Sequence, residues 1–431
     1  MKIWLALVSI ALCQAGMFYP EQVHLSWTGH ENEMRVTWVT YVSISSKVAY
    51  RPILCPNSNG DWTYVKGNYT EFEPGFVRLQ YIHQAVISDL NPDCYYEYYV
   101  GNGWFWSNKF VFQGRTPDYS APYNNKEVKM IIFGDWGIGA NGQYTKNLLL
   151  DEARMKEFLG ILHIGDLAYD LHSVGGVVGD MYLNMIQPVV ANFAYMTIPG
   201  NHEDHDHFNH YRHRFNMPWN SHNKGTGYFF SFDLGPVHFV MINTDLYLLE
   251  DQKEEAKVQT EWLKQDLEEA NRNRELRPWV IAMSHHPLYC SVNWRKPVED
   301  NGDCLGDPIV LRGELEDLFY KNKVDLFFQA HLHNYERNTA IYQNQTVSDP
   351  RDTQNSYYNP KATVYITSGN AGNDEGHNDP VSPTLSKWVR FASEDYGYGR
   401  LIAYNATHLY WEQFSAPKLT EIDHLWIIKD K

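Results

Sequence analysis

The sequence predicts two domains, an all-β sandwich followed by a layered α/β domain. Its 431 residues exceed what one ordinary hydrophobic core accommodates. Over residues 20–116, short runs of alternating apolar and polar residues are typical of half-buried strands. After residue 127, continuous apolar runs alternate with helix-like segments, which is typical of central strands covered by helices.

The first 16 residues have the composition of a secretory signal peptide. Lys2 supplies the positive start, Ile3–Cys13 is apolar, and Ala15 offers a small-residue cleavage site. That run is too short to span a bilayer, and no second run of spanning length follows it. We therefore predict a secreted protein, extracellular or lysosomal, with no membrane span.

Cysteines and glycosylation triplets agree with export. Outside the signal peptide the cysteines are Cys55, Cys94, Cys290 and Cys304. Four cysteines allow three pairings, and we favour 55 with 94 and 290 with 304 because each pair stays within one domain. Asn-x-Thr triplets predict glycosylation at Asn68, Asn344 and Asn405.

The chain is strongly acidic, with a formal net charge of −16 and no cluster of Lys or Arg. This composition argues against nucleic-acid binding. An anionic substrate would be repelled unless bound metal ions attracted it locally. The 19 histidines suit an acidic working environment, because their protonation offsets much of the negative charge.

In the N-terminal region, residues 17–116, apolar side chains alternate with polar ones in Val23–Trp27 and in Met34–Trp38. Turn residues separate these runs. The tyrosines of 95–99, following Asn91-Pro92, suit a β-sandwich with a tyrosine at a corner. Residues 117–126 are predicted to be a linker.

The C-terminal region, residues 127–431, contains seven apolar runs expected to form buried strands. They are Met130–Phe133, Ile161–Ile164, Tyr195–Ile198, Phe239–Ile242, Trp279–Met283, Val324–Phe328 and Val364–Ile366. Helices are expected near 145–159, 257–271 and 309–322.

Polar clusters directly follow five of these runs. They are Gly134-Asp135-Trp136-Gly137, Gly165-Asp166-Leu167-Ala168-Tyr169, Pro199-Gly200-Asn201-His202-Glu203, Ser284-His285-His286-Pro287 and Gln329-Ala330-His331-Leu332-His333. One such cluster alone is most often a turn or a helix cap. Five together indicate a site, because ligands bind at the carboxyl ends of strands in α/β sheets.

The residue types suit a pair of metal ions that share one bridging carboxylate. We assign Asp166 as the bridge. Metal A would be completed by Asp135, Tyr169 and His333. Metal B would be completed by Asn201, His285 and His331. The histidines at 331 and 333 are one residue apart, so an extended or looped backbone lets them serve different metals.

In order, the five clusters resemble the motifs of purple acid phosphatases, within the calcineurin-like metallophosphoesterases. The wider superfamily has His two residues after the first Asp, where this chain has Gly137; Tyr169 instead marks the purple acid group. The similarity runs from about residue 20 into the C-terminal region. It implies a fibronectin-III-like sandwich followed by an α-β-β-α metallophosphoesterase domain.

The resemblance also implies the cofactors. Metal A would be Fe(III) with Tyr169 as a phenolate, and metal B would be Fe(II), Zn(II) or Mn(II). Two positions depart from the family pattern. Ala330 replaces the usual Gly before His-x-His, which questions the loop geometry, and Ala282 replaces Val, which changes only packing.

We therefore predict an acid phosphatase that hydrolyses small phosphate monoesters by attack of a metal-bound hydroxide. His202 is the candidate general acid; the alternative is that it orients the substrate or a ligand. Glu203 is expected to support its loop. His286 is not expected to be a ligand. A solvated helical surface is expected for His205, His207, His210 and His213.

Two other functions stay open from the sequence. The first is a phosphodiesterase or nucleotidase of the same superfamily, against which Tyr169 argues. The second is a catalytically silent extracellular binding protein that uses its sandwich, against which the complete ligand set argues. The natural substrate and the oligomeric state stay open, with leaving-group selectivity assigned to loops near 172–180, 291–307 and 373–395.

Overall fold

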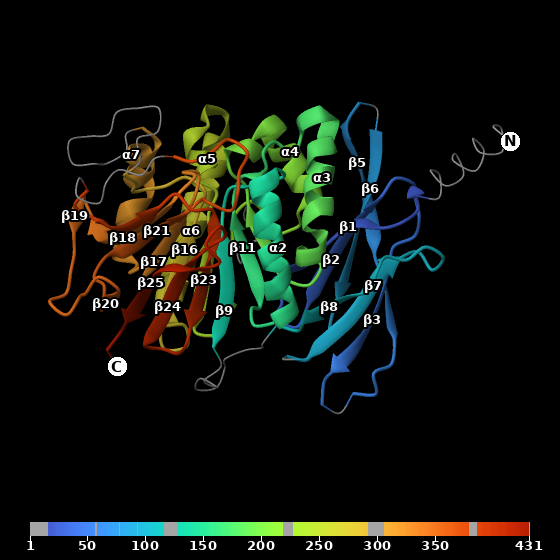
Figure 1. Ribbon diagram of the computed structural model, residues 1–431, viewed down its shortest axis with the longest axis horizontal. Helices are drawn as coiled ribbons and strands as arrows, with labels where there is room; N and C mark the ends of the chain where they lie inside the picture. The colour runs from blue at the N-terminus through green and yellow to red at the C-terminus, as the bar shows by residue number, and fades with distance from the viewer. Residues whose placement is uncertain are drawn as a thin grey trace.

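A computed structural model describes residues 16–56, 58–76, 78–92, 94–115, 127–218, 227–291, 306–378 and 386–430. Residues 1–15 of the predicted signal peptide and the predicted linker, 117–126, lie outside these ranges. In Figure 1 the N-terminal strands lie at one end of the molecule and the C-terminal strands at the other.

The N-terminal region is a sandwich of two sheets, as predicted. One sheet contains β1 (Glu21–Trp27), β2 (Met34–Thr40), β6 (Arg78–Ile87) and β5 (Asn68–Gly75) in that order. The other contains β4 (Thr63–Lys66), β3 (Lys47–Leu54), β7 (Tyr95–Gly101) and β8 (Phe110–Gln113). Tyr96 forms the predicted corner, because its hydroxyl accepts a hydrogen bond from the backbone N–H of Asn91 at 2.7 Å.

Two further sheets form the C-terminal region. The first contains β20 (Ser356–Tyr358), β25 (Thr420–Ile428), β24 (His408–Ser415), β23 (Gly397–Ala403), β9 (Val128–Phe133), β11 (Gly160–Ile164) and β13 (Ala194–Ile198). The second contains β14 (Phe230–Leu234), β15 (Val237–Met241), β16 (Trp279–Met283), β17 (Leu326–Gln329), β21 (Thr363–Ser368), β18 (Tyr335–Tyr342) and β19 (Gln345–Thr346), with β22 (Val389–Ser393) beside β18. A small pair is formed by β10 (Trp136–Gly137) and β12 (Leu167–Ala168).

Helices cover these sheets, and α2 and α3 lie side by side, with α3 packed against β1 (Figure 1). The helices are α2 (Ala140–Met155), α3 (Ser173–Val190), α4 (His205–Arg214), α5 (Asp245–Leu248), α6 (Lys253–Arg272), α7 (Asp307–Leu311) and α8 (Asp317–Lys321). Short turns are η1 (Asn201–Glu203), η2 (Glu250–Gln252) and η3 (Arg312–Glu316). The three expected helical segments correspond to α2, to α6 and to the run from α7 to α8.

Helix α3 was not expected, and the loop predicted near 172–180 is its N-terminal half. Its sequence contains Gly175, Gly176 and Gly179 at the start, Pro188 inside, and several valines, all of which have low helix propensity. Tyr182, Leu183 and Ile186 are buried on its inner face. Packing against the sheet, rather than local propensity, therefore stabilises α3.

The two regions share one continuous sheet, which the sequence did not predict. Strand β1 of the sandwich pairs in parallel with β13, with Leu25 opposite Ala194. This joins the first sheet of each region into a single sheet of 11 strands. Strand β13 therefore has a neighbour on both sides, and the segment that follows it begins from a fixed position.

The described residues contain the disulfide Cys55–Cys94, one of the two pairs we favoured. Cys290 is also disulfide-bonded; Cys304, its predicted partner, lies outside the described residues. The side chain of Asn68 is exposed, whereas Asn344 and Asn405 are half-buried. Within the described part of the chain, no helix combines the length and the apolar character needed to cross a membrane.

Candidate metal centre

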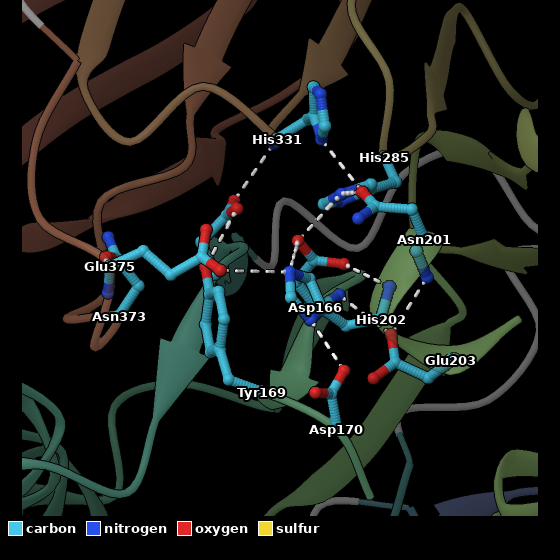
Figure 2. Close-up of polar contacts among 12 residues, drawn as sticks. Asp166, Tyr169, Asp170, Asn201, His202, Glu203, His285, His331, Asn373 and Glu375 are labelled. Atoms are coloured by element: carbon cyan, nitrogen blue, oxygen red, sulfur yellow. Dashed lines mark hydrogen bonds and ion pairs between the residues drawn. The ribbon is translucent and has the colours of Figure 1, made fainter. Parts of the chain in front are cut away.

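The five polar clusters meet at the carboxyl ends of the parallel strands of both C-terminal sheets. The strands that precede them are β9, β11 and β13 in one sheet and β16 and β17 in the other. Because the two sheets face each other, side chains from both converge in one place (Figure 2). All seven predicted ligands take part in the contacts described below.

The predicted ligands of metal A lie together. The hydroxyl of Tyr169 lies 3.2 Å from Oδ1 of Asp135 and 3.0 Å from Nε2 of His333. Nε2 of His333 is in turn 3.3 Å from Oδ1 of Asp135. A phenol, a carboxylate and an imidazole thus present one donor atom each to a single point.

The predicted ligands of metal B form a second group. Nε2 of His285 lies 3.1 Å from Oδ2 of Asp166 and 3.1 Å from Oδ1 of Asn201. Nδ1 of His331 lies 2.9 Å from the same oxygen of Asn201. Two imidazoles, an amide oxygen and a carboxylate therefore converge, which is a donor set that suits a divalent transition metal.

Asp166 lies between the two groups. Ligand atoms of Asp135, Asp166 and His285 all lie within 4.8 Å of one another, which is a spacing that can hold a metal ion. Asp135 and Asp166 are 0% and 1% exposed, and among the described residues their ion-pair partners are all histidines. Buried carboxylates surrounded by imidazoles and an amide oxygen form a donor set that fits a metal pair.

Two imidazoles are oriented from behind by backbone carbonyls. Nδ1 of His285 donates to the carbonyl of Ile164 at 3.0 Å, and Nδ1 of His333 donates to that of Gly376 at 2.9 Å. The hydrogen-bond partners assign this tautomer. Each ring therefore presents Nε2 to the site, as metal-binding histidines do when a second group holds the other nitrogen.

The local backbone explains the residue pattern of the clusters. Four of the predicted ligands have positive φ values, in the left-handed region that residues other than Gly rarely adopt. The values are 63° for Asp135, 56° for Asp166, 59° for Tyr169 and 67° for His331. A Cβ at Gly165 would lie 2.5 Å from the ring of His285. Backbone strain and close approach of this kind are concentrated at functional sites.

The pKa values of Tyr169, in the metal A group, and of Asp166, between the two groups, shift in opposite directions. Burial, together with the carboxylates of Asp135 and Asp166, raises the pKa of Tyr169 well above its usual value. Burial also raises the pKa of Asp166, but the neighbouring histidines outweigh it and hold that pKa well below its usual value. A phenolate at Tyr169 therefore requires a strongly polarising cation beside it.

His202 lies at the edge of this centre among three carboxylates. Its Nδ1 is 2.8 Å from Oδ1 of Asp170, and its Nε2 is 3.9 Å from Oδ2 of Asp166 and 3.8 Å from Oε1 of Glu375. Burial lowers its pKa, but Asp166, Asp170 and Glu375 together raise it above the usual value. His202 is thus placed to carry a proton beside the metal ligands (Figure 2).

Sequence reasoning missed Asp170 and Glu375. Asp170 directly follows Tyr169, so its position carried a signal that we did not use. Glu375 lies beyond β21, in a segment that Asn373 organises by accepting hydrogen bonds from the backbone N–H groups of residues 375 and 376. This return of the chain brings a third carboxylate to His202, beside those of Asp166 and Asp170.

His286, which was not expected to be a ligand, lies beside the site: its Nε2 is 3.0 Å from Oδ1 of Asp245, and it has a ligand atom within 4.8 Å of ligand atoms of His285 and His331. One of the weaker predictions needs correction. The histidine-rich stretch is helical but not wholly solvated. His210 is 7% exposed and packs edge-on against Phe72 of β5.

The Ala330 departure is accommodated without strain. Ala330 is fully buried and is not among the described residues with positive φ. A Cβ built at Gly134 would lie 2.4 Å from the methyl carbon of Ala330. The glycine before Asp135 therefore leaves the space that the extra methyl group fills.

Known family profiles match most of the chain. Residues 128–335 match the calcineurin-like phosphoesterase profile, which places the chain among the metal-dependent phosphoesterases. Residues 20–114 match the purple acid phosphatase N-terminal domain, and residues 362–424 match the iron/zinc purple acid phosphatase-like protein C profile.

Whole-chain relatives identify the family more closely. The chain is 36% identical to acid phosphatase type 7 of Danio rerio, covering 96% of this chain and 92% of that protein. It is 35% identical to the Homo sapiens protein of the same name, covering 95% and 91%. The fold matches that of the purple acid phosphatase PPD1 from yellow lupin, with a TM-score of 0.78, 22% identity and coverage of 96% and 75%. The chain belongs to the purple acid phosphatase family and is an enzyme of the acid phosphatase type.

Proposed function

We propose that the protein hydrolyses small phosphate monoesters in acid at an Fe(III)–M(II) pair. Fe(III) would be held by Asp135, Tyr169 and His333, and Asp166 would bridge the two ions. Fe(II), Zn(II) or Mn(II) would be held by Asn201, His285 and His331. When bound, the ions supply Lewis acidity, which neutralises phosphate oxygens and makes hydroxide available as the nucleophile in acid.

One observation carries the choice of iron for metal A. The hydroxyl of Tyr169 lies within 3.2 Å of both Asp135 and His333, inside the donor group rather than beside it. A hard trivalent cation favours anionic oxygen donors, and this position gives it a carboxylate and a phenol. Superfamily members that lack this tyrosine have no phenol to offer there.

The remaining steps fall to side chains at the edge of the centre. His202, held by Asp170, faces the metal ligands and is placed to donate a proton to the leaving alkoxide. Glu375 lies 3.8 Å from Nε2 of His202 and stabilises the protonated ring. In the alternative, His202 only orients the phosphate. Replacing His202 should then lower the rate by the same factor whatever the leaving group.

Metal analysis with a visible spectrum of the purified protein tests the iron assignment. We expect iron and a broad absorption band from phenolate-to-iron charge transfer, lost in Tyr169→Phe. Tyr182→Phe is the matched control, because its buried hydroxyl contacts Tyr195 rather than the metal ligands. Absence of iron and of the band would overturn the iron assignment and leave a metallophosphoesterase of another type.

Substrate assays test the reaction. We expect rates on a phosphate monoester to exceed those on the matching diester at acidic pH. A clear preference for the diester would favour a phosphodiesterase or nucleotidase. No turnover of either by protein with a full metal content would favour the catalytically silent binding protein.

Export is the remaining part of the proposal. The signal-like N-terminus, the disulfide and the Asn-x-Thr triplets support a glycosylated protein with an extracellular or lysosomal destination. N-terminal sequencing of protein from an expressing cell culture should give a chain that starts near residue 17. A mature chain that starts at Met1 would contradict it.

A further inference from the structure

The β5–β6 hairpin of the sandwich lies against α3 (Figure 1). A Cβ at Gly175 would lie 2.3 Å from the ring of Phe76, and one at Gly176 would lie 2.5 Å from Cβ of Pro74. Both glycines have positive φ, and a Cβ at either position would crowd the hairpin, so they suit this contact between the regions. The hairpin is seated on one defined turn of the catalytic region.

That turn has an unfavourable backbone conformation. Val174, Gly175 and Gly176 have φ values of 54°, 60° and 81° inside α3. The left-handed conformation costs about 1–2 kcal/mol for a residue other than Gly, and Val is β-branched. Such a turn persists only when surrounding contacts hold it.

Two arginines, one from each region, supply those contacts. Arg78, at the start of β6, donates to Oδ2 of Asp180 in α3 and to the carbonyl of Gly175, the latter at 3.0 Å. Arg214, in α4, donates to Oδ1 of Asp180 at 2.8 Å and to the carbonyl of Gly176 at 3.0 Å. Asp180 is thus shared by both arginines, and each also binds a carbonyl of the turn.

The turn is connected to the catalytic edge by a short run of backbone. The N–H of Gly176 donates to the carbonyl of His172, and that of Ser173 donates to the carbonyl of Asp170, both at 2.9 Å. The side chain of Asp170 lies 2.8 Å from Nδ1 of His202. An uninterrupted series of contacts therefore leads from Arg78 in the sandwich to His202.

We propose that Arg78 is a positioning residue, through which the N-terminal sandwich holds loop 170–176 and so keeps Asp170 against His202. The inference rests on the proposed role of His202. If Arg78 has this role, the N-terminal sandwich contributes to catalysis as well as to stability. Asp180 keeps Arg214 and Gln80 as partners when Arg78 is removed, so its buried charge is not left alone.

The test compares Arg78→Ala with Tyr98→Phe. Tyr98 makes another hydrogen bond between the regions, to the carbonyl of Ala191 at 2.7 Å, but at the opposite end of α3. Steady-state kinetics on a monoester should show kcat of Arg78→Ala reduced about tenfold with KM changed less than about twofold. Tyr98→Phe should lower Tm and leave kcat unchanged. Arg78→Lys should recover part of the loss, because an ammonium group reaches one acceptor instead of two.

Repeating the substitution in an Asp170→Asn variant distinguishes a positioning role of Arg78 from a general loss of stability. In Asp170→Asn, the contact through which Arg78 acts is already weakened, so adding Arg78→Ala should reduce kcat little further. Wild-type kcat in Arg78→Ala, or an equal loss in both backgrounds, would overturn the proposal. If His202→Asn has full activity, the proposed role of His202 fails instead, which is a separate result.

A variant that keeps every charge covers the case in which Arg78→Ala folds poorly. Gly175→Ala crowds the ring of Phe76 and strains the turn, while the side chains of Arg78, Asp180 and Arg214 are not substituted. Hydrogen exchange of the Ser173 and Gly176 amides should be faster in both variants than in Tyr98→Phe. Unchanged protection of these two amides would contradict the proposal.

Discussion

The carboxylate of Glu203 accepts a hydrogen bond from the backbone N–H of Asp166 at 2.9 Å, which ties the loop after β13 to the loop after β11. It also accepts from the N–H groups of Leu167 and Gly200, each at 2.9 Å. Three backbone donors thus meet one side chain that is 2% exposed. Glu203 therefore fixes the backbone that carries Asp166, the predicted bridging residue.

We therefore expect Glu203→Gln to weaken metal binding, because its amide NH₂ would face a backbone donor. Loss of a group that orients ligands typically lowers metal affinity about 10–100-fold. Chelator titration followed by metal analysis measures this. Glu375→Gln is the control, since Glu375 makes no such backbone contact in the described structure, and it should retain both metals. Equal metal retention in the two variants would contradict this role.

Asp166→Asn tests the bridge. Replacing the shared anionic carboxylate with a neutral amide should release metal from both sites and lower activity at least about 100-fold. Asp170→Asn changes the neighbouring acid in the same way and should lose activity while retaining both metals. The comparison needs metal content and kcat for each variant. Wild-type metal content and activity in Asp166→Asn would show that the centre lies elsewhere.

His202→Asn distinguishes a proton donor from an orienting residue. A general acid matters most for a poor leaving group, so the loss should reach about 10²–10⁴-fold on an alkyl phosphate. It should be much smaller on an aryl phosphate whose phenol leaves without protonation. The ratio of kcat/KM on the two substrates is the measurement. The same loss on both would identify His202 as an orienting residue.

The buried histidine of the sandwich, His83, should make stability depend on pH. Its two nitrogens contact Thr40 and Ser46 at 2.7 Å each, and burial lowers its pKa from 6.5 to about 4. Between these values the unfolded chain binds more protons than the folded one, so stability falls as pH drops from 6.5 toward 4. The expected loss between pH 7 and pH 4.5 is about 2 kcal/mol.

Thermal unfolding of wild type and His83→Gln across that pH range measures the effect. The variant should be less stable at neutral pH, because its contacts with the two hydroxyl groups are altered, but its stability should change less with pH. An equally steep pH dependence in both proteins would show that other buried groups, such as His24, account for the loss.

The strand-end clusters were predictable because they are local features. A buried parallel strand is a continuous apolar run, and the residues just beyond it lie at the sheet edge where ligands bind. Asp135, Asp166, Asn201 and His285 follow this rule, and the structure brings them together. Tyr169 needed the family resemblance as well, because nothing in its spacing alone distinguishes a phenol ligand from a packed tyrosine.

Helix α3 and the residues around His202 were harder to predict from the sequence. Gly175, Gly176 and Pro188 argue against a helix locally, and only burial against the sheet overrides them. Glu375 reaches His202 from 173 positions further along the chain, through a loop whose path no periodicity encodes. Non-local contacts of this kind depend on how the elements pack.

The sequence by itself determined the apolar runs of the central strands, the polar clusters at their ends and the acidic, histidine-rich composition, since each depends on residue type and short-range spacing. The tertiary structure alone decided that β1 pairs with β13, and that Arg78 and Asp180 link the sandwich to the loop carrying Asp170. These contacts join residues about 100 or more positions apart. Their partners are selected by burial and geometry in the assembled core, and no local pattern records them.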